Sequence, residues 1–192
     1  TDLLGYADFM DYRFYVNENV LIPRNDTEIL VELVDEYLKK MENQETQPVH
    51  LMDLCCGSGC IGISLKLYHS EVDLTLSDVS EDALNVTKKN LEQYGIKAST
   101  HCGDLFEGIA DRYDVIVSNP PYIEKRIIST LMPEVKEYEP MLALDGGEDG
   151  LSFYRTITQQ APSFLSEHGV LFFEIGCDPV SYTHLTLPTT PY

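Results

Sequence analysis

The segment from Val49 to Gly62 constrains the fold of this chain more than any other. A short apolar strand, Val49 to Met52, leads into the glycine-rich turn Asp-Leu-Cys-Cys-Gly-Ser-Gly, and an apolar helix starts at Ile61. The spacing Gly57-x-Gly59-x-x-Gly62 lets a ligand approach the backbone closely, although this spacing alone is a weak signal. Strand, glycine turn and helix in this order predict an α/β fold that binds a nucleotide-like ligand at the start of the helix.

The next predicted strand, Val72 to Ser77, ends in an acidic residue, Asp78. An acid about 20 residues after the glycine turn is expected to bind ribose hydroxyls. The alternative is that Asp78 caps the helix that follows. Ser80 can fill that capping role, so we favour the ribose role for Asp78.

A third motif, Asn119-Pro120-Pro121-Tyr122, follows the apolar run from Tyr113 to Ser118. Two prolines donate no backbone hydrogen bonds and hold the chain extended, so the Pro120 carbonyl and the Asn119 oxygen are expected to form two adjacent acceptors. Such a pair suits a planar NH2 group, and Tyr122 offers a face for stacking. The simpler alternative is a strand that ends in a proline turn.

Asp53, just before the glycines, separates two classes of ligand. Its carboxylate would repel the pyrophosphate of a dinucleotide but would attract a cation. S-adenosylmethionine carries a sulfonium and an ammonium group, so it fits this position. With Asn119 to Tyr122 holding the methyl acceptor, the chain is predicted to be a methyltransferase that acts on an amino or amide nitrogen.

On these motifs the chain resembles the peptide-chain release factor glutamine N5-methyltransferases, from about Tyr6 to about Gly176. The resemblance includes Leu21 to Glu28, with the pattern Pro-Arg-x-x-Thr-Glu, and Gly103 to Phe106. It also includes Glu139 to Leu151, with the pattern Ala-Leu-x-Gly-Gly-x-x-Gly-Leu. DNA adenine methyltransferases share Asn-Pro-Pro-Tyr but not these flanking patterns.

The resemblance implies a Rossmann-like class I methyltransferase that depends on S-adenosylmethionine, with a mostly parallel central sheet, helices on both faces and a preceding β-hairpin. It implies a methyl-transfer site and a cofactor site. The transfer site is Asn119, Pro120, Pro121 and Tyr122; the cofactor residues are Pro23, Arg24, Thr27, Glu28, Asp53, Cys55, Cys56, Gly57, Ser58, Gly59, Asp78, Val79, Asp104, Leu105 and Asn119.

Within that cofactor site, Asp53, Gly57 and Gly59 are expected to shape the methionine pocket. Asp104 and Leu105 follow the third strand, where the family contacts adenine. The Pro-Arg-x-x-Thr-Glu element is expected to close over the cofactor, although Arg24 has the alternative of being a surface ion-pair partner.

The resemblance also implies the reaction and the partner. The methyl group is expected to pass directly to a glutamine amide of a release factor, with no strong base and no metal. Two other functions stay open: an adenine-N6 methyltransferase of DNA or RNA, and a cofactor-binding remnant without activity. The sequence does not identify the release factor or the oligomeric state.

Composition and charge agree with this class. The 192 residues carry a formal net charge of −19, which disfavours non-specific binding to nucleic-acid phosphates. The chain has no apolar run of a membrane span and no visible signal peptide, so a cytoplasmic protein is expected. The five cysteines are expected to be reduced. Cys56 and Cys60 are separated by three residues, a spacing found in pairs of metal ligands. The sequence has no second Cys or His pair to complete a metal site, so buried thiols are favoured.

The periodicity predicts a hairpin from Tyr12 to Ile22 within residues 1–26, and then a catalytic domain over residues 27–177. We expect helices at Thr27 to Met41, Ile61 to Tyr68, Glu81 to Tyr94 and Ser152 to Leu165. We expect strands at Val49 to Leu54, Val72 to Ser77, Ala98 to His101, Asp114 to Ser118 and Gly169 to Ile175. Ile123 to Gly150 is expected to be a long irregular lid, with a helical piece near Ile127 to Leu131.

Both ends depart from the family pattern. The resemblance implies an N-terminal helical domain that recognises the substrate, and we expect this domain to be absent here. Residues 178–192 lack the family pattern and a helical period, and we expect them to be a non-native tail outside the fold. The closing hairpin of the family would then be missing, and the last strand would leave an open sheet edge.

Overall fold

The computed structural model describes residues 5–42, 47–128, 130, 139–176 and 185–188. A six-stranded sheet has the order β5-β4-β3-β6-β7-β8, and every neighbouring pair from β5 to β7 is parallel. Its strands are β3 His50–Leu54, β4 Asp73–Asp78, β5 Ser99–Cys102, β6 Tyr113–Ser118, β7 Leu165–Phe173 and β8 Leu185–Pro188. The predicted α/β fold with a mostly parallel central sheet is confirmed.

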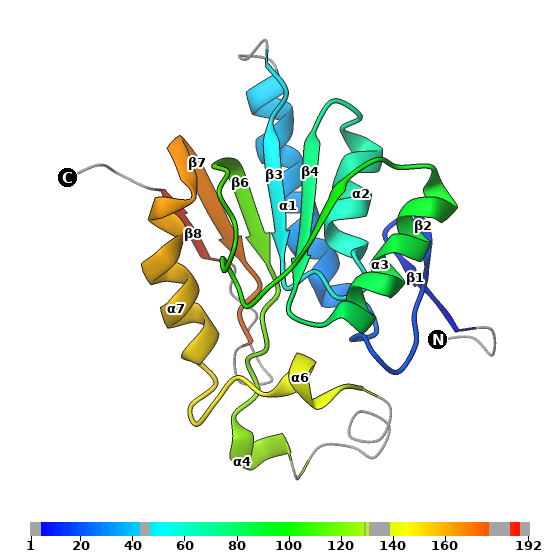
Figure 1. Cartoon of the computed structure of the whole chain (residues 1–192), viewed down its shortest axis with the longest axis vertical. Helices are drawn as coiled ribbons and strands as arrows, with labels where there is room; N and C mark the ends of the chain where they lie inside the picture. The colour runs from blue at the N-terminus through cyan, green and yellow to red at the C-terminus, as the bar shows by residue number, and fades with distance from the viewer. Residues whose placement is uncertain (1–4, 43–46, 129, 131–138, 177–184, 189–192) are drawn as a thin grey trace.

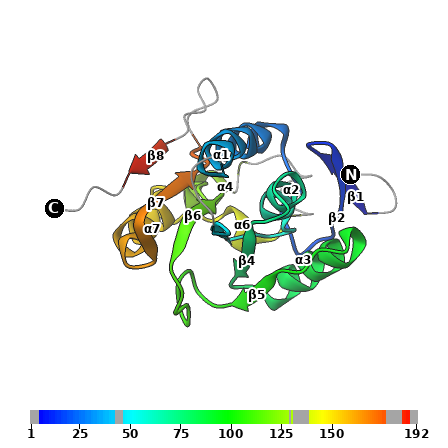
Figure 2. The same ribbon diagram turned by 90° about the horizontal axis from the view of Figure 1, so that it is seen from above.

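Helices cover both faces of this sheet (Figure 2). On one side lie α1 Asn25–Glu42, α2 Cys60–Tyr68 and α3 Glu81–Tyr94; on the other lie α7 Ser152–Gln160 and the short helix η1 Ala161–Ser163. Successive residues of a strand point to opposite faces, so Leu51 of β3 packs into the cluster with α1 and α2 while Met52 packs with α7. Near-continuous apolar strands are therefore required at the centre of the sheet.

Two glycines let α2 lie close to the strands. Gly59 precedes the helix with φ 78°, in the left-handed region, and a side chain there would lie 3.0 Å from both Ile63 and Thr87. A side chain on Gly62 would lie 3.0 Å from Asp53 and from Leu74. The glycine spacing thus serves helix packing as well as access to the backbone.

The N-terminal hairpin is formed by β1 Tyr6–Phe9 and β2 Tyr12–Tyr15, with Tyr6 opposite Tyr15. The predicted hairpin placed the strand at Tyr12 correctly but paired it with Val20 to Ile22, and this pairing is wrong. The two-residue turn at Met10, whose φ is 52°, reverses the chain before Tyr12. Val20 is buried in a small cluster with Ala83 and Val86 of α3, so the segment after β2 packs on a helix instead of forming a strand.

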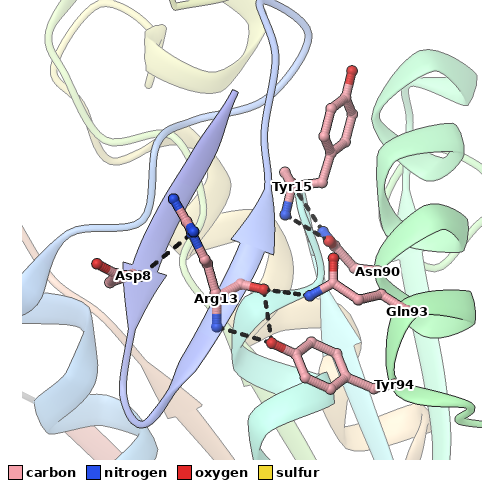
Figure 3. Close-up of polar contacts among 6 residues, drawn as sticks. All are labelled: Asp8, Arg13, Tyr15, Asn90, Gln93 and Tyr94. Carbon is pink, nitrogen blue, oxygen red and sulfur yellow. Dashed lines mark hydrogen bonds and ion pairs between the residues drawn. The ribbon is translucent and has the colours of Figure 1, made fainter. Parts of the chain in front are cut away.

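Side chains of α3 pair with the outer edge of β2 (Figure 3). Asn90 accepts from the Tyr15 amide at 2.7 Å and donates to the Tyr15 carbonyl at 3.0 Å. Tyr94 accepts from the Arg13 amide at 2.8 Å and donates to its carbonyl, and Gln93 donates to the same carbonyl. The helix therefore satisfies a strand edge that would otherwise be open to pairing with another chain.

The segment after β6 folds back on a glycine loop. Helices α4 Lys125–Ile128 and α6 Met141–Leu144 lie together at one end of the sheet (Figure 1). Ile123 pairs with Asp145, and the Gly146 amide donates to the Ile123 carbonyl at 2.9 Å. The predicted irregular lid is therefore partly structured. The predicted helical piece appears as α4, slightly earlier than expected, and Leu131 lies outside the described residues.

Two further boundaries differ from the prediction. The last helix was expected to run to Leu165, but α7 ends at Gln160 because Pro162 interrupts the helical hydrogen bonds, and β7 already begins at Leu165. The predicted open edge at β7 is wrong, because β8 pairs antiparallel with it, Val170 opposite Pro188. Part of the segment expected to lie outside the fold thus joins the sheet, while residues 177–184 and 189–192 lie outside the described residues.

The hydrogen bonds of Asn90 generate a stability prediction. Asn90→Ala is expected to lower the free energy of unfolding by about 1–3 kcal/mol, because it leaves buried backbone groups without partners. The matched control is Asn85→Ala, since Asn85 is exposed on the same helix and is expected to change stability by less than about 0.5 kcal/mol. Urea denaturation of both variants measures the difference, and equal stabilities would show that the hairpin does not depend on Asn90.

Candidate functional site

A cavity of about 410 Å³ opens at the carboxyl ends of β3, β4 and β6. Its size is typical of a small-molecule site, for which the range is about 300–1,000 Å³, and its place is where open parallel sheets bind ligands. Most of the predicted site residues line it together. They are Pro23, Arg24, Thr27, Cys55, Cys56, Gly57, Ser58, Asp78, Val79, Asp104, Leu105, Asn119 and Pro121.

The turn between β3 and α2 forms one wall of the cavity. Gly57 has φ 55°, and an added side chain would meet nothing within 4 Å, so its backbone is open to a ligand. The turn is held from outside by α3. The Thr87 hydroxyl donates to the Gly57 carbonyl at 2.8 Å, and Asn90 donates to the Ser58 carbonyl at 2.9 Å.

Asp78 lies at the end of β4 and lines the cavity. Its carboxylate accepts from the Gly57 amide at 2.9 Å and from the Ser80 amide at 3.0 Å. Ser80 is the N-cap of α3, because its side chain accepts from the Ala83 amide, so the alternative cap role for Asp78 is excluded. Burial raises the pKa of Asp78. Each carboxylate oxygen has a further lone pair for a ligand hydroxyl.

Asp53 lies behind the cavity wall rather than in its lining. One oxygen accepts from the Gly62 amide at 2.9 Å, and the other is buried with no hydrogen-bond partner among the described residues. The pKa of Asp53 is raised to about 7, mainly by burial and also by the nearby Asp78 charge, while the hydrogen bond from the Gly62 amide opposes the rise. Asp53 is thus a carboxyl group whose ionisation a nearby cation would favour.

Four other predicted site residues also lie outside the cavity lining: Glu28, Gly59, Pro120 and Tyr122. The Glu28 carboxylate accepts from the Met10 amide at 2.5 Å, so it stabilises the hairpin turn. Pro120 is buried, and Gly59 is packed against Thr87. These residues lie beside the cavity rather than in its lining.

The Asn119 side chain lies at the cavity edge. Its Nδ2 donates to the Thr27 hydroxyl at 3.4 Å, which connects the end of β6 to the first turn of α1. Ser118, just before it, donates to the Leu54 carbonyl at 2.7 Å and fixes β6 to β3. The strand end that carries Asn119 is therefore held on both sides.

Three glycines enclose Tyr122. A side chain on Gly146 would lie 2.6 Å from the Tyr122 Cα, and one on Gly150 would overlap the Tyr122 carbonyl. A side chain on Gly176 would overlap the Tyr122 ring. The glycines of the Ala-Leu-x-Gly-Gly-x-x-Gly-Leu pattern thus let distant segments pack directly on Tyr122.

Arg24 contacts Glu139 from the far side of the cavity. Its guanidinium lies 2.5 Å from the Glu139 carboxylate, whose side chain is only 2% exposed. Burial raises the pKa of Glu139, and the Arg24 charge opposes that rise. The Arg24 side chain is 43% exposed, so the ion pair of the alternative is present alongside a place in the cavity lining.

Sequence reasoning missed several residues around the cavity. Glu139 and Glu174 are buried acids beside it, Leu142 and Phe153 line it, and Thr87 and Asn90 support it from α3. Glu139 and Glu174 stood in recognised patterns, so their place in those patterns was a usable signal. For Thr87 and Asn90, their apolar-face position on a helix beside buried Val86 and Leu91 was the available signal.

The cysteines at the turn are free thiols. Cys56 and Cys60 are buried, as predicted, and burial raises the pKa of Cys60 to about 12. In the part of the chain that the structure describes, no group of three or more His, Cys, Asp or Glu side chains gathers as a metal site. Cys177 lies outside the described residues. None of the described helices is both long and apolar enough to cross a membrane.

The chain is similar to several characterised sequences. It is 44% identical to the release factor glutamine methyltransferase of Clostridium acetobutylicum, over 90% of this chain and 60% of the relative. It is 41% identical to that of Geobacter sulfurreducens, over 91% and 59%. It is 40% identical to the ribosomal protein uL3 glutamine methyltransferase of Bordetella pertussis, over 91% and 58%. The chain spans about three fifths of the length of the curated relatives it matches.

The fold is similar to solved methyltransferases. The 16S rRNA N2 G1207 methyltransferase of Thermus thermophilus, in complex with AdoMet and guanosine, matches 88% of this chain and 40% of its own, with a TM-score of 0.60 and 17% identity. The ribosomal protein L11 methylase of Lactobacillus delbrueckii subsp. bulgaricus matches 79% and 60%, with a TM-score of 0.54 and 17% identity.

These likenesses agree with the parallel sheet. The sequence profile of the methyltransferase small domain matches residues 27–135, which run from the first turn of α1, through the glycine turn, to the segment after Tyr122. The chain therefore belongs to the methyltransferase small domain family.

Proposed function

We propose that this protein transfers a methyl group from S-adenosylmethionine to the side-chain amide nitrogen of a protein glutamine. The observation that carries the proposal is the position of Asn119. Its Nδ2 is bonded to Thr27, which leaves its oxygen for an acceptor amide at the edge of the cavity. The relatives named as glutamine methyltransferases support the choice of acceptor.

The residues of the cavity fit S-adenosylmethionine. The open backbone at Gly57 admits a ligand, and Asp78 has lone pairs for ribose hydroxyls. Asp53 and Asp78 are buried carboxyl groups whose pKa values are raised by burial, and a positively charged ligand nearby would stabilise their ionised forms. When bound, S-adenosylmethionine supplies a methyl group attached to a positively charged sulfur.

The protein's own residues would orient the acceptor. An amide nitrogen is a poor nucleophile because its lone pair is delocalised into the carbonyl. Hydrogen bonds from its NH2 group to the Asn119 oxygen and the Pro120 carbonyl would hold the nitrogen in line for attack. They would strengthen as positive charge develops on nitrogen, which stabilises the transition state. Alignment of two reactants can contribute roughly 7–11 kcal/mol.

The natural acceptor is proposed to be a peptide chain release factor, since most of the similar relatives carry that activity in their names. Another relative is named for ribosomal protein uL3, so a ribosomal glutamine is the outcome to compare. Both acceptors belong to translation, which favours a cytoplasmic protein. Neither requires direct contact with nucleic acid, in agreement with the net charge of −19.

Mass spectrometry tests the proposed reaction. The protein is incubated with methyl-labelled S-adenosylmethionine and, in separate reactions, a release factor, ribosomal protein uL3 and adenine-containing oligonucleotides. Label on one glutamine supports the proposal, and the two protein substrates identify the partner. Label on adenine would instead support the adenine-N6 alternative. Cofactor binding without label on any substrate would support a binding remnant.

Asp78 is expected to bind the cofactor. Asp78→Ala is predicted to weaken the affinity for S-adenosylmethionine by about 1.5–3 kcal/mol, the range for a hydrogen bond to a charged group. Asp82→Ala is the matched control, because Asp82 is an exposed acid nearby in the first turn of α3. Isothermal titration calorimetry measures both, and an unchanged dissociation constant in folded Asp78→Ala would remove Asp78 from the cofactor site.

Asn119 is expected to act on the acceptor. Asn119→Ala is predicted to lower the single-turnover transfer rate by about 10²–10³-fold, the typical effect of losing one preorganised polar contact. Cofactor affinity should stay nearly unchanged. Asn119→Asp should not restore the rate fully, because it adds a charge beside groups arranged for a neutral amide. A parallel loss of affinity and rate would assign Asn119 to the donor site, and a parental rate would exclude the acceptor role.

A further inference from the structure

Asn119 belongs to a cluster of polar side chains next to the cavity. The cluster consists of Thr27 from α1, Asn119 and Tyr122 after β6, and Glu174 after β7. Thr27 and Glu174 are each 3% exposed. The Glu174 backbone amide donates to the Ser118 carbonyl at 3.0 Å. Because Ser118 directly precedes Asn119, this backbone hydrogen bond connects Glu174 to the strand end that carries Asn119.

The Glu174 carboxylate is surrounded by donors from these segments. Its Oε1 accepts from the Tyr122 hydroxyl at 3.5 Å. Its Oε2 is buried and has no donor in good geometry among the described residues, while Thr27 and Asn119 are near enough to lower its pKa by hydrogen bonding. Burial raises the pKa more strongly, and the Asp26 charge adds to the rise.

The direction of the hydrogen bonds in this cluster follows from the chemistry of each group. An ionised carboxylate only accepts hydrogen bonds, so it favours an orientation of the nearby Thr27 hydroxyl with its hydrogen toward Glu174. The lone pairs of Thr27 are then left to accept from Asn119, as the Nδ2 contact at 3.4 Å shows. A side-chain amide that is hydrogen-bonded through its nitrogen directs its oxygen away from that partner, and Asn119 lines the cavity.

Protonation of Glu174 would allow the hydrogen bonds between Glu174, Thr27 and Asn119 to run in the opposite direction. As an O–H donor it can point at the Thr27 oxygen, and the Thr27 hydroxyl can then point at Asn119. The Asn119 amide would turn so that its oxygen accepts from Thr27 and its NH2 faces the acceptor. The Asn119 NH2 and the NH2 of the acceptor amide are both donors and cannot hydrogen-bond to each other. This orientation of Asn119 therefore does not hold the acceptor.

We propose that Glu174 and Thr27 are positioning residues that fix the orientation of the Asn119 amide, with its oxygen toward the acceptor. This inference rests on the proposed function for its consequence in catalysis, but the orientation itself is a property of the protein alone. Three polar side chains lie at the Glu174 carboxylate: Thr27, Asn119 and Tyr122. Asp26 and Cys60 interact with it electrostatically, and the Tyr154 hydroxyl donates to the Glu174 backbone carbonyl.

Kinetics as a function of pH form the first part of the test. In the parent, the single-turnover rate on the glutamine substrate is expected to fall as the pH is lowered through the raised pKa of Glu174, because protonation releases the amide. Glu174→Gln is expected to be slower by about 10-fold at neutral pH, the value of one hydrogen bond, and to show no such fall. Glu167→Gln is the matched control, since Glu167 is an exposed acid on β7.

Thr27 gives an independent variant. Thr27→Val keeps the shape of the side chain but removes the hydroxyl, and it is expected to lower the rate by about 10-fold. Thr27→Ser keeps the hydroxyl and is expected to restore most of the rate. Parental rates and pH profiles in both Thr27→Val and Glu174→Gln would overturn the proposal.

Nuclear magnetic resonance separates this inference from the proposed function. The side-chain NH2 signals of Asn119, assigned by their loss in Asn119→Ala, are expected to shift as Glu174 titrates in the parent. The same signals should stay unchanged over this pH range in folded Glu174→Gln. Absence of the titration in the parent would overturn the positioning role. A clear titration in a protein that methylates no glutamine would contradict only the proposed reaction.

Discussion

The turn between β3 and α2 is the constraint on which the rest of the site depends. It must leave its backbone open at Gly57, so its own side chains cannot stabilise it. The neighbouring elements supply the support instead: Asp78 accepts from the Gly57 amide, and Thr87 and Asn90 donate to the turn carbonyls. A polar turn at a buried helix start is stable only when each of these groups is satisfied.

Asn90 extends this support to the N-terminal hairpin. The same side chain that holds the Ser58 carbonyl also pairs with both backbone groups of Tyr15. Displacement of the hairpin would therefore be felt at the cofactor turn through one buried amide. This coupling explains why a small two-stranded element, which would be marginal alone, packs as part of the domain.

The segments beside the cavity at Asn119 are organised around Tyr122 and Glu174. Gly146 and Gly150 bring one distant segment against Tyr122, and Gly176 brings a second. Glu174 lies among the side chains of Thr27, Asn119 and Tyr122. The proposed donor and acceptor sides of the site are thus built from different elements that meet at Asn119. This division is what allows separate predictions for cofactor affinity and for transfer rate.

Local patterns in the sequence determined the parallel sheet, the cofactor turn and most of the cavity lining, because strand–turn–helix order and the spacing of Gly57, Gly59 and Asp78 are local properties. The partner of β2, the pairing of β8, the place of Asp53 behind the wall and the roles of Asn90, Glu139 and Glu174 were decided only by the tertiary structure. The physical reason is the same in each case: a buried polar group or a strand edge is satisfied by whichever partner the fold brings near, and that partner lies far away along the chain.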